Sequence, residues 1–456
     1  MRNRMAIVLA AGKGTRMKSN LYKVLHPICG LPMVEHVIRA VKRSDVKQIL
    51  SIVGHGAEQV KEVLGDRSAY ALQEEQLGTG HAVRQAAPLL ANQVGSTLVI
   101  CGDTPLLTSD TLIQLFEQHE QANAKATILT AEVEDPTGYG RIVRTTSGEV
   151  CKIVEHKDAT PQELAIKEIN TGTYVFDNQL LFAMLEKVTN DNAQGEYYLP
   201  DVIELLKEAG EKVVACVMQD NAEALGVNDR VALAQATEMM SQRINEQHMR
   251  NGVTLVRPQT IYIEADVTIG ADTFIEPGVI LKGSTCIGAG CTIGANSEIV
   301  ASQIADNVQI TQSVIEYSSV QSGTTIGPFA HVRPNSHLGQ RVHIGNFVEV
   351  KNSQVGNDTK AGHLTYIGDS DLGQGINVGC GTIFVNYDGK HKHRSTVGDQ
   401  AFIGCNANIV SPVRIGERSF IAAGTTVTQD VPAESLAISR IPQQNIPNYW
   451  QKFSKK

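Results

Sequence analysis

The chain has 456 residues, which is too long for a single hydrophobic core, so we expect two or three domains. Hydrophobic residues make up 42% of the chain and charged residues 19%, as in soluble globular proteins. The net charge of −8 argues against a nucleic-acid-binding protein, and no apolar stretch is long enough to span a membrane. The eight cysteines are scattered without a CxxC pair, so we expect no zinc site, no disulfide framework and a cytoplasmic location.

The N-terminal half begins with a buried strand and a glycine-rich turn. Residues 5–10 form a continuous apolar run, which is typical of a strand covered on both faces. The turn that follows, with Gly12 and Gly14, matches neither the P-loop nor the dinucleotide-binding pattern. Its backbone N–H groups can still bind phosphates, helped by Lys13 and Arg16.

Strand and helix patterns then alternate. Residues 48–53, 69–73 and 97–101 read as strands, and residues 34–42 and 110–119 as amphipathic helices. This order predicts an α/β sheet with helices on its faces and a ligand site beyond the carboxyl ends of the strands. The Gly78–Thr79–Gly80 turn and Asp103 follow such strands, and a carboxylate there can hold Mg²⁺ beside phosphates. The alternative is that Asp103 only caps a helix or a turn.

Further polar motifs follow at residues 138–142, 153–158, 168–172, 192–198 and 226–230. They offer groups for sugar hydroxyls, and Asn228 offers a second Mg²⁺ ligand. Residues 228–250 then have a helical pattern that predicts a connecting arm.

The second half repeats every six residues. Residues 267–272 read VTIGAD, residues 285–290 read TCIGAG and residues 291–296 read CTIGAN, and the phrase recurs to about residue 431. An aliphatic residue followed by glycine at a fixed six-residue spacing predicts a parallel β-helix, in which each hexad forms a short strand and a corner. A sandwich of ordinary short strands is the alternative.

The repeat is interrupted at residues 386–394, where a polar loop ends in Lys392, His393 and Arg394. A loop extruded from a regular solenoid favours ligand binding, and its basic end suits a sugar phosphate. Arg333, Lys351 and Lys360 lie in neighbouring coils, although each could also be a solvated surface charge.

Three motifs carry a resemblance to known enzymes: LAAGxGTxM at residues 9–17, QLGTGH at residues 76–81 and GHxxY at residues 362–366. Over almost its whole length the chain resembles the bifunctional bacterial enzymes that join an N-acetylglucosamine-1-phosphate uridyltransferase to a glucosamine-1-phosphate acetyltransferase. The resemblance implies an α/β nucleotidyltransferase domain with a Rossmann-like sheet at residues 1–227, a helical linker at 228–251, and a left-handed parallel β-helix with a C-terminal tail at 252–456. It also implies a homotrimer, with acyl-CoA clefts between neighbouring β-helices, that supplies cell-wall precursors.

For the first domain the resemblance implies Mg²⁺-dependent transfer of uridylate from UTP to N-acetylglucosamine 1-phosphate, with release of pyrophosphate. Asp103 and Asn228 would bind Mg²⁺, and Arg16 and Lys23 would face phosphate charge. The implied nucleotide and sugar site consists of Leu9, Ala10, Ala11, Gly12, Lys23, Gln73, Gly78, Thr79, Cys101, Gly102, Asp103, Gly140, Glu155, Asn170 and Asn228. Tyr22 departs from the family pattern, which has proline before the lysine.

For the second domain it implies acetyl transfer from acetyl-CoA to glucosamine 1-phosphate, with His363 as general base and Glu349 orienting the amine or the histidine. The implied amino-sugar-phosphate site consists of Arg333, Lys351, Tyr366 and Asn377. The implied acetyl-CoA site consists of Cys380, Asn386, Tyr387, Cys405, Ala423 and Arg440. Cys380 and Cys405 stand where the family has alanine and serine, so a covalent acetyl-cysteine route is an alternative.

Two other functions stay open at this stage. The chain could be a one-site nucleotidyltransferase whose β-helix only assembles subunits, or a non-enzymatic subunit that keeps the fold for protein contacts. His363, the loop at residues 386–394 and Arg440 argue against the first. Gly12, Lys23, Asp103 and Asn228 argue against the second.

Overall fold

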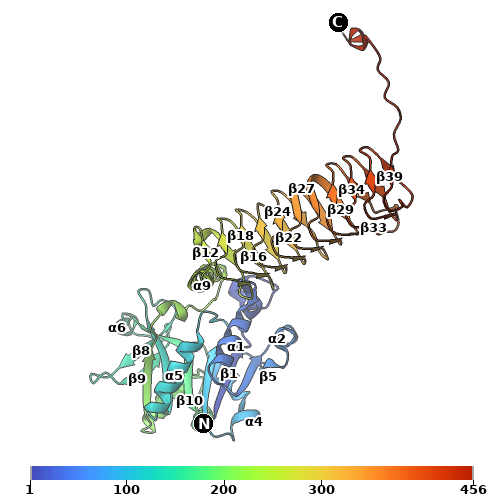
Figure 1. Ribbon diagram of the computed structural model, residues 1–456. Helices are drawn as coiled ribbons and strands as arrows, with labels where there is room; N and C mark the ends of the chain where they lie inside the picture. Colours follow the sequence, from blue (N-terminus) through green and yellow to red (C-terminus); the bar gives the residue numbers. More distant parts are fainter. Residues whose placement is uncertain (1–2, 454–456) are drawn as a thin grey trace. The chain divides into compact units, whose positions relative to one another are not determined.

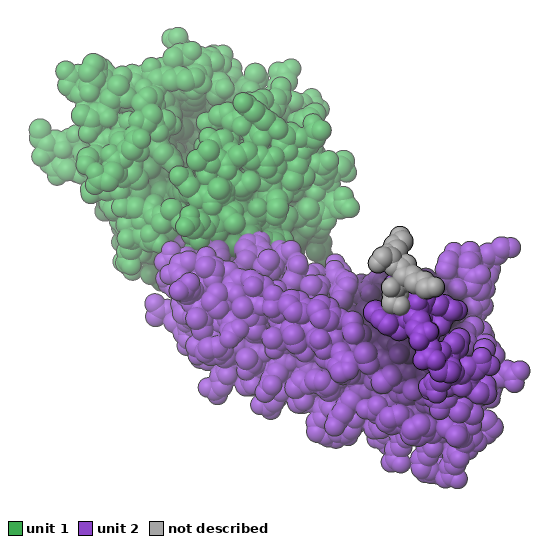
Figure 2. All heavy atoms as spheres, turned by 90° about the horizontal axis from the view of Figure 1, so that it is seen from above, with its two compact units in different colours: residues 1–240 green, residues 241–456 purple. Residues whose placement is uncertain are grey.

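The computed structural model describes residues 3–453 and divides the chain into two compact units, Met1–Met240 and Ser241–Lys456 (Figures 1 and 2). The division falls inside a 21-residue helix, α9 (Arg230–Arg250). In the described part of the chain, no helix combines the length and the apolar character needed to cross a bilayer.

Unit 1 is built on a nine-stranded sheet with the central order β11-β7-β10-β6-β1-β4-β5. Strands β8 and β9 form a hairpin, and β8 also pairs with β10. The strands are β1 (Arg4–Ala10), β4 (Gln48–Val53), β5 (Ala69–Leu72), β6 (Ser96–Cys101), β7 (Ala126–Glu132), β8 (Gly140–Arg144), β9 (Val150–Val154), β10 (Glu168–Asp177) and β11 (Val213–Val217). The predicted strands at the N-terminus are confirmed, with ends shifted by a residue or less.

The sheet is mixed, because β10 runs antiparallel to both β6 and β7. The strands β6, β1, β4 and β5 are parallel to one another, so their carboxyl ends meet at one edge. The predicted glycine turn follows β1, Gln73 follows β5 and Asp103 follows β6.

Helices cover both faces of the sheet, and the alternating side chains of β1 explain why. Ala6 and Val8 join a core with α1 and α5, whereas Met5 and Ile7 join a second core with α7 and α8. The helices are α1 (Met33–Arg43), α2 (Ala57–Leu64), α3 (Thr79–Arg84), α4 (Ala87–Leu90), α5 (Ser109–Gln121), α6 (Pro161–Leu164), α7 (Asn178–Leu185) and α8 (Asp201–Glu208). The two helices expected at residues 34–42 and 110–119 are confirmed as α1 and α5.

Unit 2 is a β-helix of short parallel strands, from β12 (Thr254–Leu255) to β39 (Leu436–Ala437) (Figure 1). Two sheets of 19 and 9 strands form its walls. The aliphatic residue of each hexad points inward, and these residues form one continuous core from Val253 to Val431. The predicted hexad coils are therefore confirmed.

The strands of the candidate acetyl-transfer region lie in successive coils of this array. They are β25 (His331–Val332), β27 (His343–Lys351), β29 (Lys360–Gly368), β31 (Asn377–Val378), β32 (Ile383–Val385), β34 (Phe402–Ile403) and β37 (Phe420–Ile421). Each residue therefore lies level with an equivalent residue in the next coil, such as Glu349 with Tyr366. The loop after β32 is the predicted interruption, and an antiparallel bridge between Tyr387 and Lys392 closes it.

Candidate functional site

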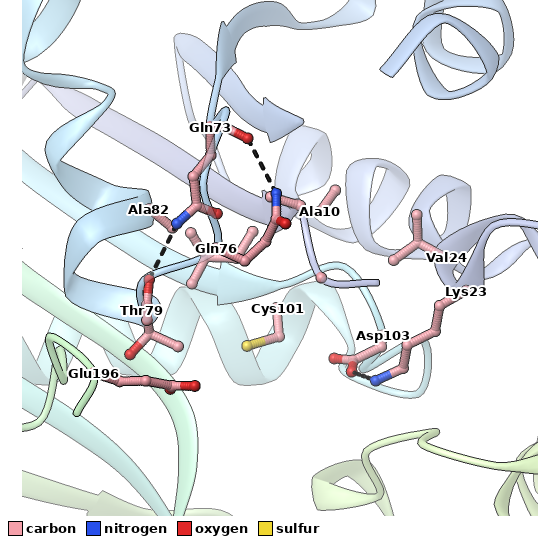
Figure 3. Close-up of a pocket in the computed structure, with 14 residues that line it drawn as sticks. Ala10, Lys23, Val24, Gln73, Gln76, Thr79, Ala82, Cys101, Asp103 and Glu196 are labelled. Carbon is pink, nitrogen blue, oxygen red and sulfur yellow. Dashed lines mark hydrogen bonds and ion pairs between the residues drawn. The ribbon is translucent and has the colours of Figure 1, made fainter. Parts of the chain in front are cut away.

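A cavity of 270 Å³ opens at the carboxyl ends of the parallel strands of unit 1 (Figure 3). Its lining residues are Leu9, Ala10, Ala11, Gly12, Lys23, Val24, Gln73, Gln76, Gly78, Thr79, Ala82, Cys101, Asp103 and Glu196. The structure thus brings together most of the expected nucleotide-site residues. Gly102, Gly140, Glu155, Asn170 and Asn228 do not line it.

Two glycines of the first turn shape this part of the site, and only Gly12 lines the cavity. A Cβ on Gly12 would meet no atom within 4 Å, so a side chain there would project into open space. Gly14 has φ of +62°, and a Cβ on it would lie 2.4 Å from the Cβ of Lys23. The close approach between this turn and Lys23 therefore requires glycine at position 14.

Lys23 joins the two residues expected to bind Mg²⁺. Its ammonium group forms an ion pair with Asp103 and donates to Asn228 Oδ1 at 2.8 Å. Arg16 Nη2 also donates to Asn228 Oδ1, at 2.9 Å. A carboxylate and an amide oxygen thus share one cationic group, and hard oxygen donors of this kind suit Mg²⁺.

The far wall of the cavity depends on residues 196–198, which belong to the polar motif at residues 192–198. Gly80 N donates to Tyr197 O at 2.8 Å, and Tyr197 N donates to Leu77 O at 2.8 Å. These bonds fix residues 76–80 against residues 196–198 and bring Glu196 to the cavity. Glu196 lies in one of the polar motifs noted above, but its distance in sequence gave no sign of this contact.

Gln73 is fixed by two hydrogen bonds at the same wall. Its side chain, 3% exposed, donates to Gly78 O at 3.2 Å and lies 3.0 Å from His81 Nδ1. Gln76 in turn donates to Gln73 O at 3.2 Å (Figure 3). The amide groups are therefore held in place before any ligand arrives.

The three residues expected to contact the amino sugar lie together. Gly140 pairs with Asn170 between β8 and β10, and a Cβ on Gly140 would lie 3.3 Å from Glu155 Oε1. Burial, together with the nearby charges of Asp158, Asp201 and Glu196, raises the pKa of Glu155. This group is polar and confined, as a site for sugar hydroxyls requires.

Cys101 lines the cavity at the end of β6. Burial, reinforced by the negative charge of Asp103, raises the pKa of its thiol to about 12. Gly102 N donates to Leu9 O at 2.9 Å, which joins the ends of β6 and β1. Cys101 is therefore a protonated lining group at neutral pH.

In unit 2, a buried carboxylate that the sequence analysis did not identify organises the candidate acetyl-transfer region. Asp369 is 6% exposed and accepts hydrogen bonds from Lys351 at 3.1 Å, from Asn352 and from Asn386. Burial opposes ionisation, but these donors outweigh it and lower the pKa of Asp369. Asn386 also donates to Tyr366 Oη at 3.2 Å, so one network holds three of the expected residues.

Positive charge gathers beside this network. Arg333 Nη1 donates to Glu349 Oε1 at 2.7 Å. The neighbouring ammonium of Lys351 lowers the pKa of Lys392. Arg394 pairs with Asp371 and donates to Asn352 O at 2.8 Å, which anchors the end of the loop.

His363 is exposed and lies on β29 level with Asn346 in the preceding coil. Glu349 lies level with Tyr366 and contacts Arg333. At the acetyl-CoA side, Arg440 Nη1 donates to Ala423 O at 3.4 Å. Cys380 is half-buried and Cys405 is exposed in neighbouring coils.

Comparisons with known proteins match both halves of the chain. Residues 5–240 match the nucleotidyl transferase family, residues 258–355 match the GMPPB C-terminal domain, and residues 394–429 match six bacterial transferase hexapeptide repeats. The bifunctional protein GlmU of Bacillus subtilis is 56% identical over 456 residues, covering 100% of both chains. GlmU of Levilactobacillus brevis is 58% identical over 99% of both chains, and that of Listeria welshimeri is 56% identical over 100% of this chain and 99% of its own.

The chain belongs to the GlmU family. It is a bifunctional transferase that joins a nucleotidyltransferase domain to a hexapeptide-repeat transferase domain. Expected site residues converge in the cavity of unit 1, in the cluster of Gly140, Glu155 and Asn170, and in the network around Asp369.

Proposed function

We propose that unit 1 transfers uridylate from UTP to N-acetylglucosamine 1-phosphate and releases pyrophosphate. The observation that carries this proposal is the cavity that joins the glycine turn, the fixed amide of Gln73 and the Lys23–Asp103 pair. It offers neutral hydrogen-bonding groups for the uridine base on one side and charged groups for phosphates on the other. Gly140, Glu155 and Asn170 would contact the amino sugar.

Uridylyl transfer needs alignment and charge stabilisation rather than a protein nucleophile. Gly12 leaves room for the phosphates at the turn, and Lys23 and Arg16 place cationic groups beside them. Asp103 and Asn228 are the residues that would hold Mg²⁺, since their oxygens already share one cationic neighbour. When bound there, Mg²⁺ would offset the negative charge that develops on the phosphates.

We further propose that unit 2 transfers acetyl from acetyl-CoA to the amine of glucosamine 1-phosphate. Arg333, Lys351 and Lys392 supply positive charge for the sugar phosphate, and Asp369 fixes Lys351 and Asn386. Tyr366 on β29 and Asn377 on β31, which lies level with Lys360, would contact the sugar. Tyr387, Cys380, Cys405, Ala423 and Arg440 would border acetyl-CoA.

His363 is the residue that we assign as general base. The amine of glucosamine 1-phosphate enters as an ammonium with a pKa of about 7.7–8.0, and a histidine side chain can accept its proton at neutral pH. Once deprotonated, the amine attacks the thioester carbon, and CoA leaves as its thiol. The product, N-acetylglucosamine 1-phosphate, is the acceptor for unit 1, and the final UDP-N-acetylglucosamine would supply cell-wall synthesis.

Measuring both half-reactions on one preparation tests the proposal. Wild-type protein should release CoA from acetyl-CoA with glucosamine 1-phosphate, and pyrophosphate from UTP with N-acetylglucosamine 1-phosphate and Mg²⁺. His363→Ala should lower acetyl transfer by about 100-fold or more while uridylyl transfer persists. Uridylyl transfer without acetyl transfer in the wild type would support the one-site alternative, and absence of both would support a non-enzymatic role.

We propose that the active form is a homotrimer in the cytoplasm. Exposed aromatic rings stack in pairs on the outside of the β-helix. The ring centroids of Phe329 and Phe347 are 5.3 Å apart, and those of Phe402 and Phe420 are 4.5 Å apart. Association of subunits would bury these rings. All eight cysteines are free thiols, which suits a reducing compartment. Light scattering that returns the mass of a monomer would contradict the trimer.

A further inference from the structure

Four residues of the candidate acetyl-transfer region stand in one column, one per coil. The register pairs Ala361 with Val378 and Tyr366 with Ile383, which brings His363 level with Cys380. Asn377 pairs with Phe402, and Asn406 N donates to Cys380 O at 2.7 Å, which brings Cys380 level with Cys405.

The same column continues into the next coil. Phe402 pairs with Phe420, and Gly424 N donates to Cys405 O at 2.8 Å, so Cys405 lies level with Ala423. The order along the column is therefore His363, Cys380, Cys405 and Ala423, and Arg440 contacts the last of these.

The coils that carry the two cysteines are in contact at this level. A Cβ on Gly379 would lie 2.6 Å from Cys405 N, so the coils touch at the residue just before Cys380. Level residues of neighbouring strands have Cα atoms about 4.8 Å apart, which lies within the range that a disulfide spans. Cys405 is exposed and Cys380 is half-buried, so a reagent reaches Cys405 first.

The column also places these thiols near the expected position of the thioester sulfur in the proposed acetyl transfer. A thioester attacked beside His363 must place its sulfur within reach of the column, and Ala423 and Arg440 border the expected acetyl-CoA. This step rests on the acetyl transfer proposed above. A disulfide that carries a CoA group would bring its own sulfur to the same place, and binding would raise its effective concentration there.

We propose that Cys380 and Cys405 form a dithiol modification site for CoA-derived disulfides. The Cys405 thiolate attacks one sulfur of CoA disulfide, a Cys405–CoA mixed disulfide forms, and one CoA leaves and takes up a proton. The Cys380 thiolate then attacks the Cys405 sulfur, and the second CoA leaves as its thiol. The two cysteine thiols are thereby oxidised to one disulfide, and CoA disulfide is reduced to two CoA thiols. The closed disulfide would fix two coils beside His363 and block acetyl transfer.

The test uses the reduced full-length protein, CoA disulfide and peptide mass spectrometry. Cys286 is the internal control, because it is an exposed cysteine of the same β-helix outside the column. Cys405 should react about tenfold faster than Cys286, as expected for a bound reagent. A CoA analogue that lacks the sulfur should protect Cys405 and leave Cys286 reactive. The cross-linked Cys380–Cys405 peptide should accumulate in the wild type.

Two variants separate the steps. Cys380→Ala should stop at the mixed disulfide on Cys405, and Cys405→Ser should lose the rapid reaction. Each variant is compared with its own untreated sample. Equal rates at Cys405 and Cys286, or a wild-type protein that accumulates only the CoA adduct, would overturn the proposal.

Activity measurements distinguish this inference from the proposed function. Treated wild-type protein should lose acetyl transfer by about tenfold or more, regain it with a dithiol reductant, and keep uridylyl transfer. Untreated protein that transfers no acetyl contradicts the proposed function, whatever the cysteines do. Untreated protein that transfers acetyl but whose activity resists CoA disulfide contradicts only the dithiol site.

Discussion

Asp369 shows how one buried side chain can hold several residues of a candidate site in place. It neutralises Lys351 and fixes the amide of Asn386, which in turn contacts Tyr366. Losing a buried charged hydrogen-bond partner costs about 1.5–3 kcal/mol, which corresponds to roughly 10- to 150-fold in binding.

Asp369→Asn should therefore raise KM for glucosamine 1-phosphate about tenfold or more, with a smaller effect on kcat. The measurement is steady-state acetyl transfer, with uridylyl transfer as a check on folding. Asp358→Asn is the matched control, because that carboxylate forms an exposed ion pair with Arg341 away from the loop. An unchanged KM in Asp369→Asn would remove this residue from the site.

Asp201 provides a pH-dependent prediction. Burial, with the nearby charges of Glu204 and Asp158, raises its pKa to about 6. An acid with a raised pKa in the folded state binds its proton more tightly there than when unfolded, so its ionisation destabilises the fold between about pH 4 and pH 6. Above pH 6 Asp201 is ionised in the folded state, and the loss of folding stability is complete.

Asp201→Asn should raise the thermal stability of unit 1 at pH 7 by at most about 1 kcal/mol, since partial exposure screens the effect. Below pH 4 the variant and the wild type should unfold at the same temperature. Calorimetry across this range, with Asp110→Asn, an exposed carboxylate in the first turn of α5, as control, measures the difference. A stabilisation that persists unchanged at low pH would point to another cause.

At the scale of elements, the turn that carries Lys23 is held by Tyr22 where the family has proline. Tyr22 is 5% exposed, its hydroxyl donates to Ala10 O at 2.7 Å, and a Cβ on Gly56 would lie 3.2 Å from its ring. Proline rigidifies a turn by fixing φ. Here a buried ring and a hydrogen bond to the end of β1 serve that purpose.

Tyr22→Phe keeps the ring and loses the hydrogen bond, which is worth about 1 kcal/mol. We expect kcat of uridylyl transfer to fall roughly fivefold, because Lys23 is then less firmly placed beside the phosphates. Tyr70→Phe is the control, since it also removes a hydroxyl bonded to a backbone carbonyl, that of Gly65, outside the cavity. Equal effects of the two substitutions would argue against a role for the turn.

The elements were predictable to the extent that each carries its own pattern. The hexads repeat the same inward aliphatic residue, and β1 is a continuous apolar run, so both were readable directly. The antiparallel direction of β10 could not be predicted, because strand direction depends on partners that are distant in sequence. Asp369 and Glu196 were missed for the same reason, since their importance arises from contacts between separate coils or segments.

At the scale of the whole molecule, each unit has its own hydrophobic core. Unfolding should then occur in two steps, because cooperativity extends only as far as a shared core. UTP with Mg²⁺ should raise only the transition of unit 1, and acetyl-CoA only that of unit 2. Differential scanning calorimetry with each ligand checks this, and a single transition that shifts with either ligand would contradict it.

Because the coils stack in register, successive coils of the β-helix are about 4.8 Å apart. Inserting one residue would turn inward side chains outward, but inserting one complete coil between β12 and β25 would leave every later position facing as before. The coils that precede Arg333 can therefore change in number over evolution while the column from His363 to Ala423 stays intact. In this fold, the number of coils can change without altering the residues of the column.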